Sequence, residues 1–106
     1  MVHVDVQILS ERALPNGLAF QASVRETERA PALARSIEVR LHWADYNLWS
    51  IDGADAPERV AAAVLRFAAS RVALADLPES FDASTLRRRH ADADETIAGH
   101  LRRGSG

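Results

Sequence analysis

Apolar and polar residues alternate with a period of two in three stretches of the first half of the chain. These stretches cover residues 2–8, 18–24 and 37–43. A period of two places the apolar side chains on one face of a β-strand. Between the first two stretches, Pro15-Asn16-Gly17 carries turn chemistry, because proline fixes φ and Asn-Gly tolerates positive φ. The pattern therefore predicts an antiparallel hairpin over residues 2 to about 26, followed by a third strand.

A helical period replaces the alternation in the second half of the chain. Asp55, Pro57 and Glu58 form a helix start signal, with a capping carboxylate, a proline in the first turn and a glutamate three residues after the cap. The helix is predicted to continue to about Ala75, before Pro78 ends it. The expected buried stripe consists of Val60, Ala61, Val64, Leu65, Phe67, Ala68 and Val72.

Two shorter helices are predicted to complete the chain. Asp82 is expected to cap one that ends at His90, and Asp92 or Asp94 is expected to begin the last. Strands followed by helices predict an α+β fold in two layers. Its sheet is expected to be a three-stranded antiparallel β-meander, covered on one face by a long helix plus one or two short C-terminal helices.

The length of 106 residues suits one domain with one core. We expect residues 1–103 to form a single α+β domain, and residues 104–106 to be a flexible C-terminal tail or an expression scar. The chain has no cysteine, which excludes disulfides and thiolate sites. It shows neither a basic leader nor an apolar run of membrane-spanning length, so we expect a cytoplasmic protein that does not contact membranes.

Composition narrows the class of partner. All 13 basic residues are arginine and alanine is abundant, which indicates a bacterial source with a GC-rich genome. The net charge of −2 gives no general attraction to nucleic acid or to anionic lipid. Nucleic acid is therefore not expected as a partner of the whole surface.

Aromatic, imidazole and carboxylate groups are concentrated where the third strand meets the following segment. His42, Trp43, Asp45, Tyr46 and Trp49 make up this cluster, which contains both tryptophans and the only tyrosine. Such groups at the end of an element can line a small-ligand site, with the imidazole and the carboxylate as polar anchors. They can equally cap a core, with ring N–H and hydroxyl bonded to nearby backbone. The sequence leaves both interpretations open.

The phase of the third strand orients this cluster. Trp43 is expected to point into the core and His42 to point outward. The chain is expected to leave the sheet near Ala44 or Asp45, because a buried carboxylate would be costly. His42 could act as a base oriented by Asp45, but no nucleophile stands beside them in sequence. Enzyme status stays open, and the sequence favours a role without catalysis.

No cofactor and no metal are expected. A glycine-rich phosphate loop is absent, and acidic residues already occupy the start of the long helix. The four histidines lack the spacing of a helical zinc pair, and the acidic stretches lack the pattern of a calcium loop. The histidines are therefore interpreted as scattered surface residues.

Arg87, Arg88 and Arg89 form the one basic run, and they are the candidates for contact with nucleic acid. This run ends a predicted helix, where cations complement the helix dipole, and acidic residues begin the next helix. The charges thus account for one another without a partner. Contact with nucleic acid through these arginines is the weakest of the functional hypotheses.

The edge of the sheet offers a different kind of site. Val2, Val4, Val6 and Ile8 lie on a β-rich strand that has no lysine or proline to discourage pairing with another chain. We therefore hypothesise a non-catalytic bacterial protein-interaction domain, a homodimer formed through this strand. Such a domain would serve as an accessory, antitoxin-like or immunity-type partner of a second protein. The alternative is a small-molecule-binding protein or a small enzyme with its site in the aromatic cluster.

Overall fold

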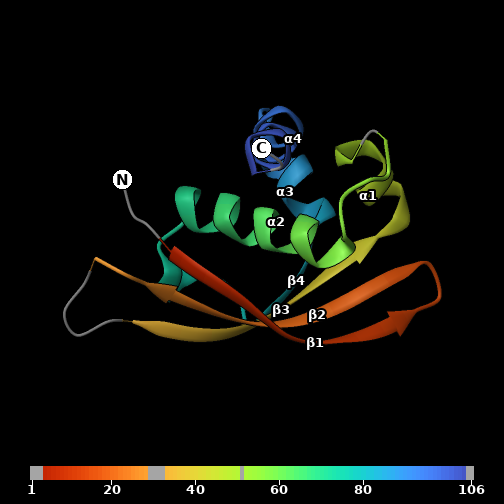
Figure 1. The fold of residues 1–106 in the computed structure, drawn as a ribbon. Helices are drawn as coiled ribbons and strands as arrows, with labels where there is room; N and C mark the ends of the chain where they lie inside the picture. The colour runs from red at the N-terminus through yellow and green to blue at the C-terminus, as the bar shows by residue number, and fades with distance from the viewer. Residues whose placement is uncertain (1–3, 29–32, 51, 105–106) are drawn as a thin grey trace.

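The computed structural model describes residues 4–28, 33–50 and 52–104. Its elements are β1 (Val4–Leu14), β2 (Gly17–Glu26), β3 (Ala34–His42), α1 (Trp43–Trp49), α2 (Pro57–Arg71), the 3₁₀ turn η1 (Leu74–Asp76), β4 (Ser80–Asp82), α3 (Ser84–Arg89) and α4 (Ala93–Gly104). The four strands form one sheet in the order β1-β2-β3-β4, in which β3 and β4 are parallel and the other pairs antiparallel. The α-helices lie on one side of this sheet (Figure 1).

The α+β class and the meander of β1, β2 and β3 are confirmed, whereas the fourth strand was not predicted. β4 has three residues, which is too short for an alternating pattern to become visible. The expectation that Asp82 caps the next helix is wrong, because Asp82 is the last residue of β4. Its Oδ1 accepts a hydrogen bond from Arg40 Nε at 2.5 Å. α3 instead follows Ala83, whose side chain makes no capping bond.

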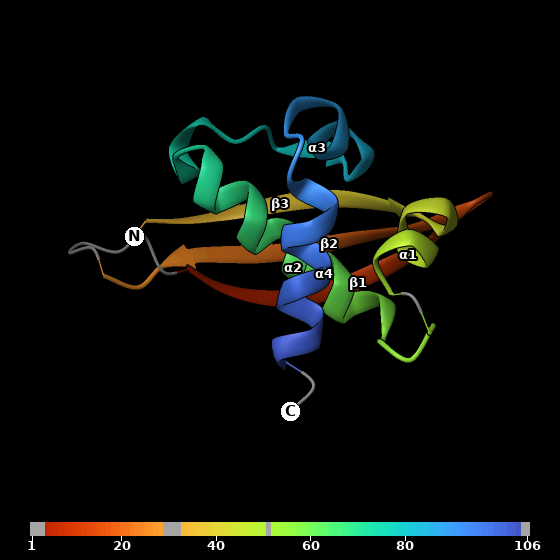
Figure 2. The ribbon, with the colours of Figure 1, turned by 90° about the horizontal axis from the view of Figure 1, so that it is seen from above.

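The expected two layers are in fact three, because α2 lies between the sheet and α4 (Figures 1 and 2). α2 is consequently buried around most of its circumference. The residues buried beyond the expected stripe are Ala62, Ala63 and Ala69. Methyl side chains allow other elements to approach this helix closely on the side away from the sheet. Glu58, Arg66 and Ser70 remain exposed, and Arg59 is half-buried.

α2 ends at Arg71, earlier than the predicted Ala75. Val72 already has extended backbone, with φ −133° and ψ 138°, and it is 36% exposed where a buried position was expected. The segment that follows is held by Arg35 of β3. Its guanidinium donates hydrogen bonds to the carbonyl oxygens of Leu74, at 2.9 Å, and of Leu77. A side chain from the sheet therefore fixes the path of the chain between α2 and β4.

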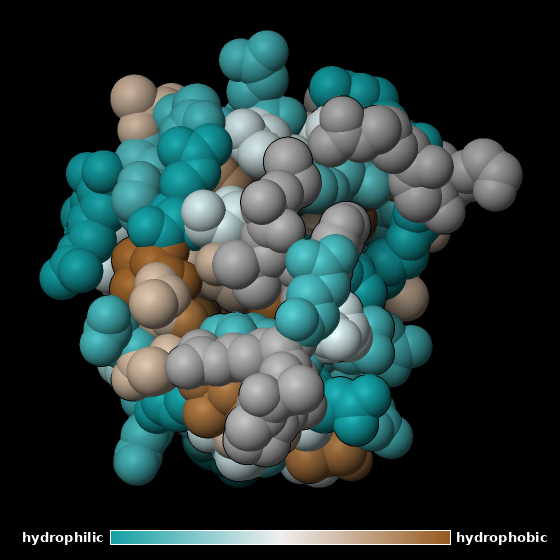
Figure 3. All heavy atoms as spheres, turned by 90° about the vertical axis from the view of Figure 1, so that its left-hand side faces the viewer, coloured by the Kyte–Doolittle hydropathy of each residue, from teal (hydrophilic) through white to brown (hydrophobic). Residues whose placement is uncertain are grey.

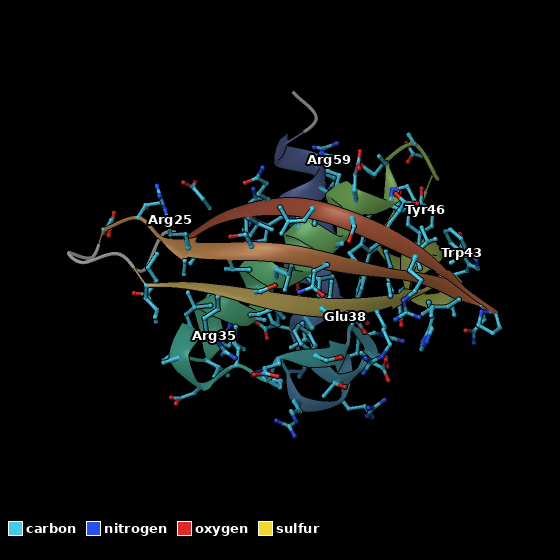
Figure 4. All side chains as sticks on the ribbon, turned by 90° about the horizontal axis from the view of Figure 1, so that it is seen from below. Arg25, Arg35, Glu38, Trp43, Tyr46 and Arg59 are labelled. Carbon is cyan, nitrogen blue, oxygen red and sulfur yellow. The ribbon has the colours of Figure 1, made fainter. Side chains whose placement is uncertain are left out.

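The core lies between α2 and the inner face of the sheet, the face that carries the alternating apolar residues. The fully buried residues of β2 and β3 are Phe20, Ala22, Val24, Ile37, Val39 and Leu41. The register places Phe20 opposite Val39 and Ala22 opposite Ile37, so these side chains meet on one face. No helix among the described residues covers the outer face of the sheet (Figure 4). On that face Glu38 lies among arginines, with Arg40 at 3.1 Å and Arg12 at 3.4 Å.

The turn at Pro15 and Asn16 is confirmed, but Gly17 is needed there for a reason other than positive φ. Among the described residues, only Gly53 has a positive φ, of 67°. At Gly17, an added Cβ would lie 2.3 Å from the carbonyl oxygen of Leu41 and 2.7 Å from Cα of His42. The start of β2 thus touches the backbone at the end of β3, and only glycine fits.

We predict that Gly17→Ala destabilises the protein by about 1–3 kcal/mol, because the clashing atoms belong to the backbone and cannot rotate away. Gly99→Ala is the matched control, since a Cβ at Gly99 of α4 meets nothing within 4 Å. There the change should stabilise the helix by up to about 1 kcal/mol. Urea titration of both variants tests the prediction. Equal stabilities would contradict the close approach of β2 and β3.

Candidate functional site

The expectation that Trp43 is buried is wrong. Trp43 is 41% exposed and is the first residue of α1. The chain leaves the strand phase here, slightly before the predicted exit at Ala44 or Asp45, so the inward-facing positions end at Leu41. The N–H of Trp43 donates to the carbonyl oxygen of Asn16 at 2.9 Å, which ties the start of α1 to the hairpin turn. Figure 4 shows Trp43 beside Tyr46, at one end of the sheet.

The other two aromatic residues of the cluster cap the core. Tyr46 is 9% exposed and Trp49 is 2% exposed. The hydroxyl of Tyr46 donates to the carbonyl oxygen of Asp55 at 2.5 Å, and Trp49 Nε1 donates to Asp94 Oδ1 at 2.9 Å. Both polar groups are thus engaged inside the molecule. These contacts favour the core-capping interpretation over a ligand site.

Asp45 is buried, with 4% of its surface exposed, although the sequence argued against burial. The cost is offset because its Oδ1 accepts a hydrogen bond from Arg87 Nη1 at 3.1 Å. Arg87 Nε also donates to Asp94 Oδ1 at 2.9 Å. The hydrogen bond to Asp94, and then that to Asp45, raises the pKa of Arg87 above its ordinary value. Arg87 therefore joins α1, α3 and α4 as a structural residue.

The remaining arginines of the basic run differ from one another. Arg88 donates to the hydroxyls of Ser84, at 3.4 Å, and Thr85, at 3.3 Å, one turn earlier in α3. The side chain of Arg89 makes no ion pair or hydrogen bond within the described ranges 4–28, 33–50 and 52–104. The three arginines therefore do not form one free basic surface.

Of the predicted ligand cluster, only Trp49 lines the hollow that lies between α4 and the loop before α2. His42 is half-buried opposite Gly17 and belongs to the outer face of the sheet. Trp49 lines a shallow hollow of about 250 Å³ together with Asp55 of the loop and Leu101 of α4. His42, Trp43, Asp45 and Tyr46 do not line it.

The part of the chain that the structure describes contains neither a metal-binding cluster nor a membrane-spanning helix. No group of three or more histidine, aspartate or glutamate side chains is placed there to hold a metal ion. No helix there is long and apolar enough to cross a membrane.

β1 is an open edge of the sheet, as the interface hypothesis requires. Val4, Val6 and Ile8 are half-buried on the inner face, where they pack against the core. Val2 lies outside the described residues. A bulge between Ile8 and Ser10 breaks the register with β2, and Leu9 at this bulge is 54% exposed. The adjacent apolar pair Ile8 and Leu9 interrupts the alternation, and this interruption is the trace that the bulge leaves in the sequence.

The backbone hydrogen bonds show which residues of β1 face the open edge. The N–H of Glu26 in β2 donates a hydrogen bond to the carbonyl oxygen of Leu33, just before β3, at 2.9 Å. The backbone of Glu26 therefore faces β3. Directions alternate along a strand, so the backbone of Arg25 faces β1 and its cross-strand neighbour Asp5. The N–H and C=O groups of Val4, Val6 and Ile8 must therefore point away from β2. The same alternation makes Leu14 and Gly17 the bonded pair that closes the hairpin.

Comparison with protein-family models, with curated proteins and with solved structures found no match to this chain.

Removal of Arg87 tests its structural role. We predict that Arg87→Ala lowers the free energy of unfolding by about 1–3 kcal/mol, because it leaves the buried carboxylate of Asp45 without its charged donor. Arg88→Ala is the control on the same helix and should change stability by less than about 0.5 kcal/mol, since its contacts are exposed. Urea denaturation followed by tryptophan fluorescence measures both. Equal effects would mean that Arg87 is only a surface charge.

Proposed function

We propose that this protein is a non-catalytic interaction domain that forms a homodimer by pairing the open edge of β1 with β1 of a second copy. The observation that carries the proposal is the outward direction of the backbone groups of Val4, Val6 and Ile8. No further strand of the described sheet pairs with β1, although α2 and α4 on the inner-face side extend past this edge (Figures 2 and 4). Unpaired N–H and C=O groups on an edge strand are a template for another strand.

The surface supports contact through backbone more than through a broad apolar face. Figure 3 shows mostly hydrophilic atoms among the described residues on the left-hand side of Figure 1, with apolar atoms in separate patches. A strand edge needs no large apolar patch, because its main-chain hydrogen bonds supply directionality. The half-buried valines of β1 would add apolar contact on the inner face.

The bulge restricts pairing to Val4–Ile8. A bulge twists the strand and interrupts the alternation of outward groups, which is one way in which proteins protect a sheet edge. Beyond Leu9, the strand also carries the charged residues Glu11 and Arg12. The first half of β1 has Asp5 as its only charged residue and no bulge. This half is therefore the segment open to a second copy.

Two-fold symmetry then selects one register, centred on Val6. Each Val6 faces the other, and each Val4 faces Ile8 of the second copy, so every outward residue finds an outward partner. On the outer face, Asp5 meets Gln7 of the second copy. A register centred on Asp5 would place two carboxylates opposite each other, which is unfavourable. One centred on Gln7 would place Val4 opposite Ser10, beyond the bulge.

This pairing joins two four-stranded sheets into one continuous sheet. The two-fold axis is perpendicular to the sheet, so the helices of both copies lie on the same side. The interface is a short strand pair with few apolar side chains, smaller than the interfaces of typical stable complexes. We therefore expect a dimer that dissociates in the micromolar range. An accessory, antitoxin-like or immunity-type role toward another protein remains part of this proposal.

Light scattering tests the homodimer. We expect the mass to rise from monomer to dimer as the concentration increases through the micromolar range. Val6→Pro should keep the protein folded and monomeric, because the lost N–H faces the open edge. Gln7→Pro is the matched control and should unfold the protein instead, because the N–H of Gln7 faces β2. A wild-type monomer at high micromolar concentration would refute the proposal.

Engineered cysteines test the register, because the chain has no cysteine of its own. Asp5 and Gln7 of opposing copies form a non-hydrogen-bonded pair, with Cα atoms about 4.5 Å apart. This separation suits a disulfide. An equal mixture of Asp5→Cys and Gln7→Cys should give a covalent dimer under mild oxidation, whereas either variant alone should give little. A dimer by mass without this cross-link would reject the register and leave the homodimer in place.

A further inference from the structure

The sheet has a second open edge at β4, on the side opposite β1. The N–H of Glu38 donates to the carbonyl oxygen of Glu79, and the N–H of Ala83 donates to that of Arg40, each at 2.8 Å. In a parallel ladder, alternate residues face the neighbouring strand, so Ser80 and Asp82 direct their backbone groups away from β3. No described residue accepts a hydrogen bond from either N–H.

A hollow of about 340 Å³ lies against this edge. Ser80 and Asp82 line it on one side, and α2, α3 and the segment before β4 enclose the rest. Its apolar lining consists of Ala68, Val72, Leu77, Pro78, Phe81 and Leu86. The volume falls in the range of sites that bind small groups in proteins, about 300–1,000 Å³. Free backbone donors and an apolar hollow therefore occur side by side.

The charges around the hollow are only partly compensated. Arg40 is bound by Asp82, at 2.5 Å, and by Glu38 on the outer face. Arg89 of α3 also lines the hollow, and its side chain has no partner among the described residues. Asp76 lies on the segment that leads into β4, and its carboxylate likewise has no partner among the described residues. The hollow thus has an available cation on one flanking segment and an available anion on the other.

We propose that this hollow binds an extended peptide segment of a second protein. The peptide adds as a short strand to β4, places one apolar side chain in the hollow and directs a carboxylate to Arg89. Main-chain bonds to Ser80 and Asp82 hold the backbone, and the hollow selects the side chain, as in other cases of strand addition. Arginine suits the carboxylate, because its planar fork can donate two parallel hydrogen bonds.

A peptide fits this site better than a compact small molecule. The two outward residues of β4 repeat along the strand direction, and only an extended backbone matches that repeat. β4 is three residues long, so the recognised segment is short and its affinity modest. The site is separate from β1, and it stands whether or not the protein is a homodimer.

The probe is a seven-residue peptide of alternating threonine and valine, with leucine at its centre and a free C-terminal carboxylate. The same peptide with a C-terminal amide is the comparison. We expect the acid to shift the amide NMR signals of residues 76–90 of the ¹⁵N-labelled protein, and to bind at least fivefold more tightly than the amide. No shift in this segment at millimolar peptide overturns the proposal. Shifts confined to residues 4–8 also overturn it, and locate strand addition at β1 instead.

Four variants locate the contacts. Arg89→Ala should remove the difference between acid and amide, whereas Arg88→Ala, on the same helix but outside the hollow, should preserve it. Ser80→Pro should weaken both peptides, because it deletes an outward N–H while the backbone bonds between β3 and β4 use Glu79, Phe81 and Ala83. Ser80→Ala controls for loss of the hydroxyl contacts with Arg40 and Glu38 and should leave binding unchanged. Fold is checked by the dispersion of the NMR spectrum. Unchanged binding by Arg89→Ala and Ser80→Pro would overturn the proposal.

Discussion

The rest of the structure depends on the burial of α2 on both sides. A helix that faced solvent on one side would need one apolar stripe, but α2 is buried at nine positions, five of them alanine. Alanine favours the helix and keeps its surface narrow, so the sheet and the outer helices can both approach it. The described helices cover only the inner face of the sheet (Figure 1). Its inner apolar residues meet α2, and its polar outer face has no helix to bind.

The outer layer is held by charge as well as by apolar packing. Asp94 of α4 accepts hydrogen bonds from Trp49 of α1 and Arg87 of α3, and Asp92 forms an ion pair with Arg71 of α2. The hydrogen bond from Arg71 lowers the pKa of Asp92. These bonds engage Trp49 and Arg87, two residues that the sequence offered as candidates for a site, inside the molecule. Polar groups that looked functional in the sequence join short helices that have little core of their own.

The sequence predicted the elements in which the hydrophobic pattern repeats many times. It failed where the course of the chain or the burial of a residue depended on a single contact. The hairpin, the third strand and α2 repeat their pattern over many residues, so local errors cancel. Trp43 continued the alternation in sequence, yet a helix begins at this residue. Burial of Asp45 depended on Arg87, 42 residues later. β4 and the bulge at Leu9 are too short to produce a period. The hydrophobic pattern therefore could not predict contacts between residues far apart in the sequence, or irregularities of only a few residues.

The two edges of the sheet are protected in different ways, and this difference bears on what each can bind. β1 is long, but its bulge and the charges beyond it leave only Val4–Ile8 regular. β4 is short, which limits self-association, but it borders an apolar hollow. The short regular segment Val4–Ile8 selects mainly by register, which an identical strand satisfies by symmetry. A short edge beside a pocket selects by side chain, which favours a different chain. Under the two proposals, one small sheet separates self-recognition at β1 from recognition of a partner at β4.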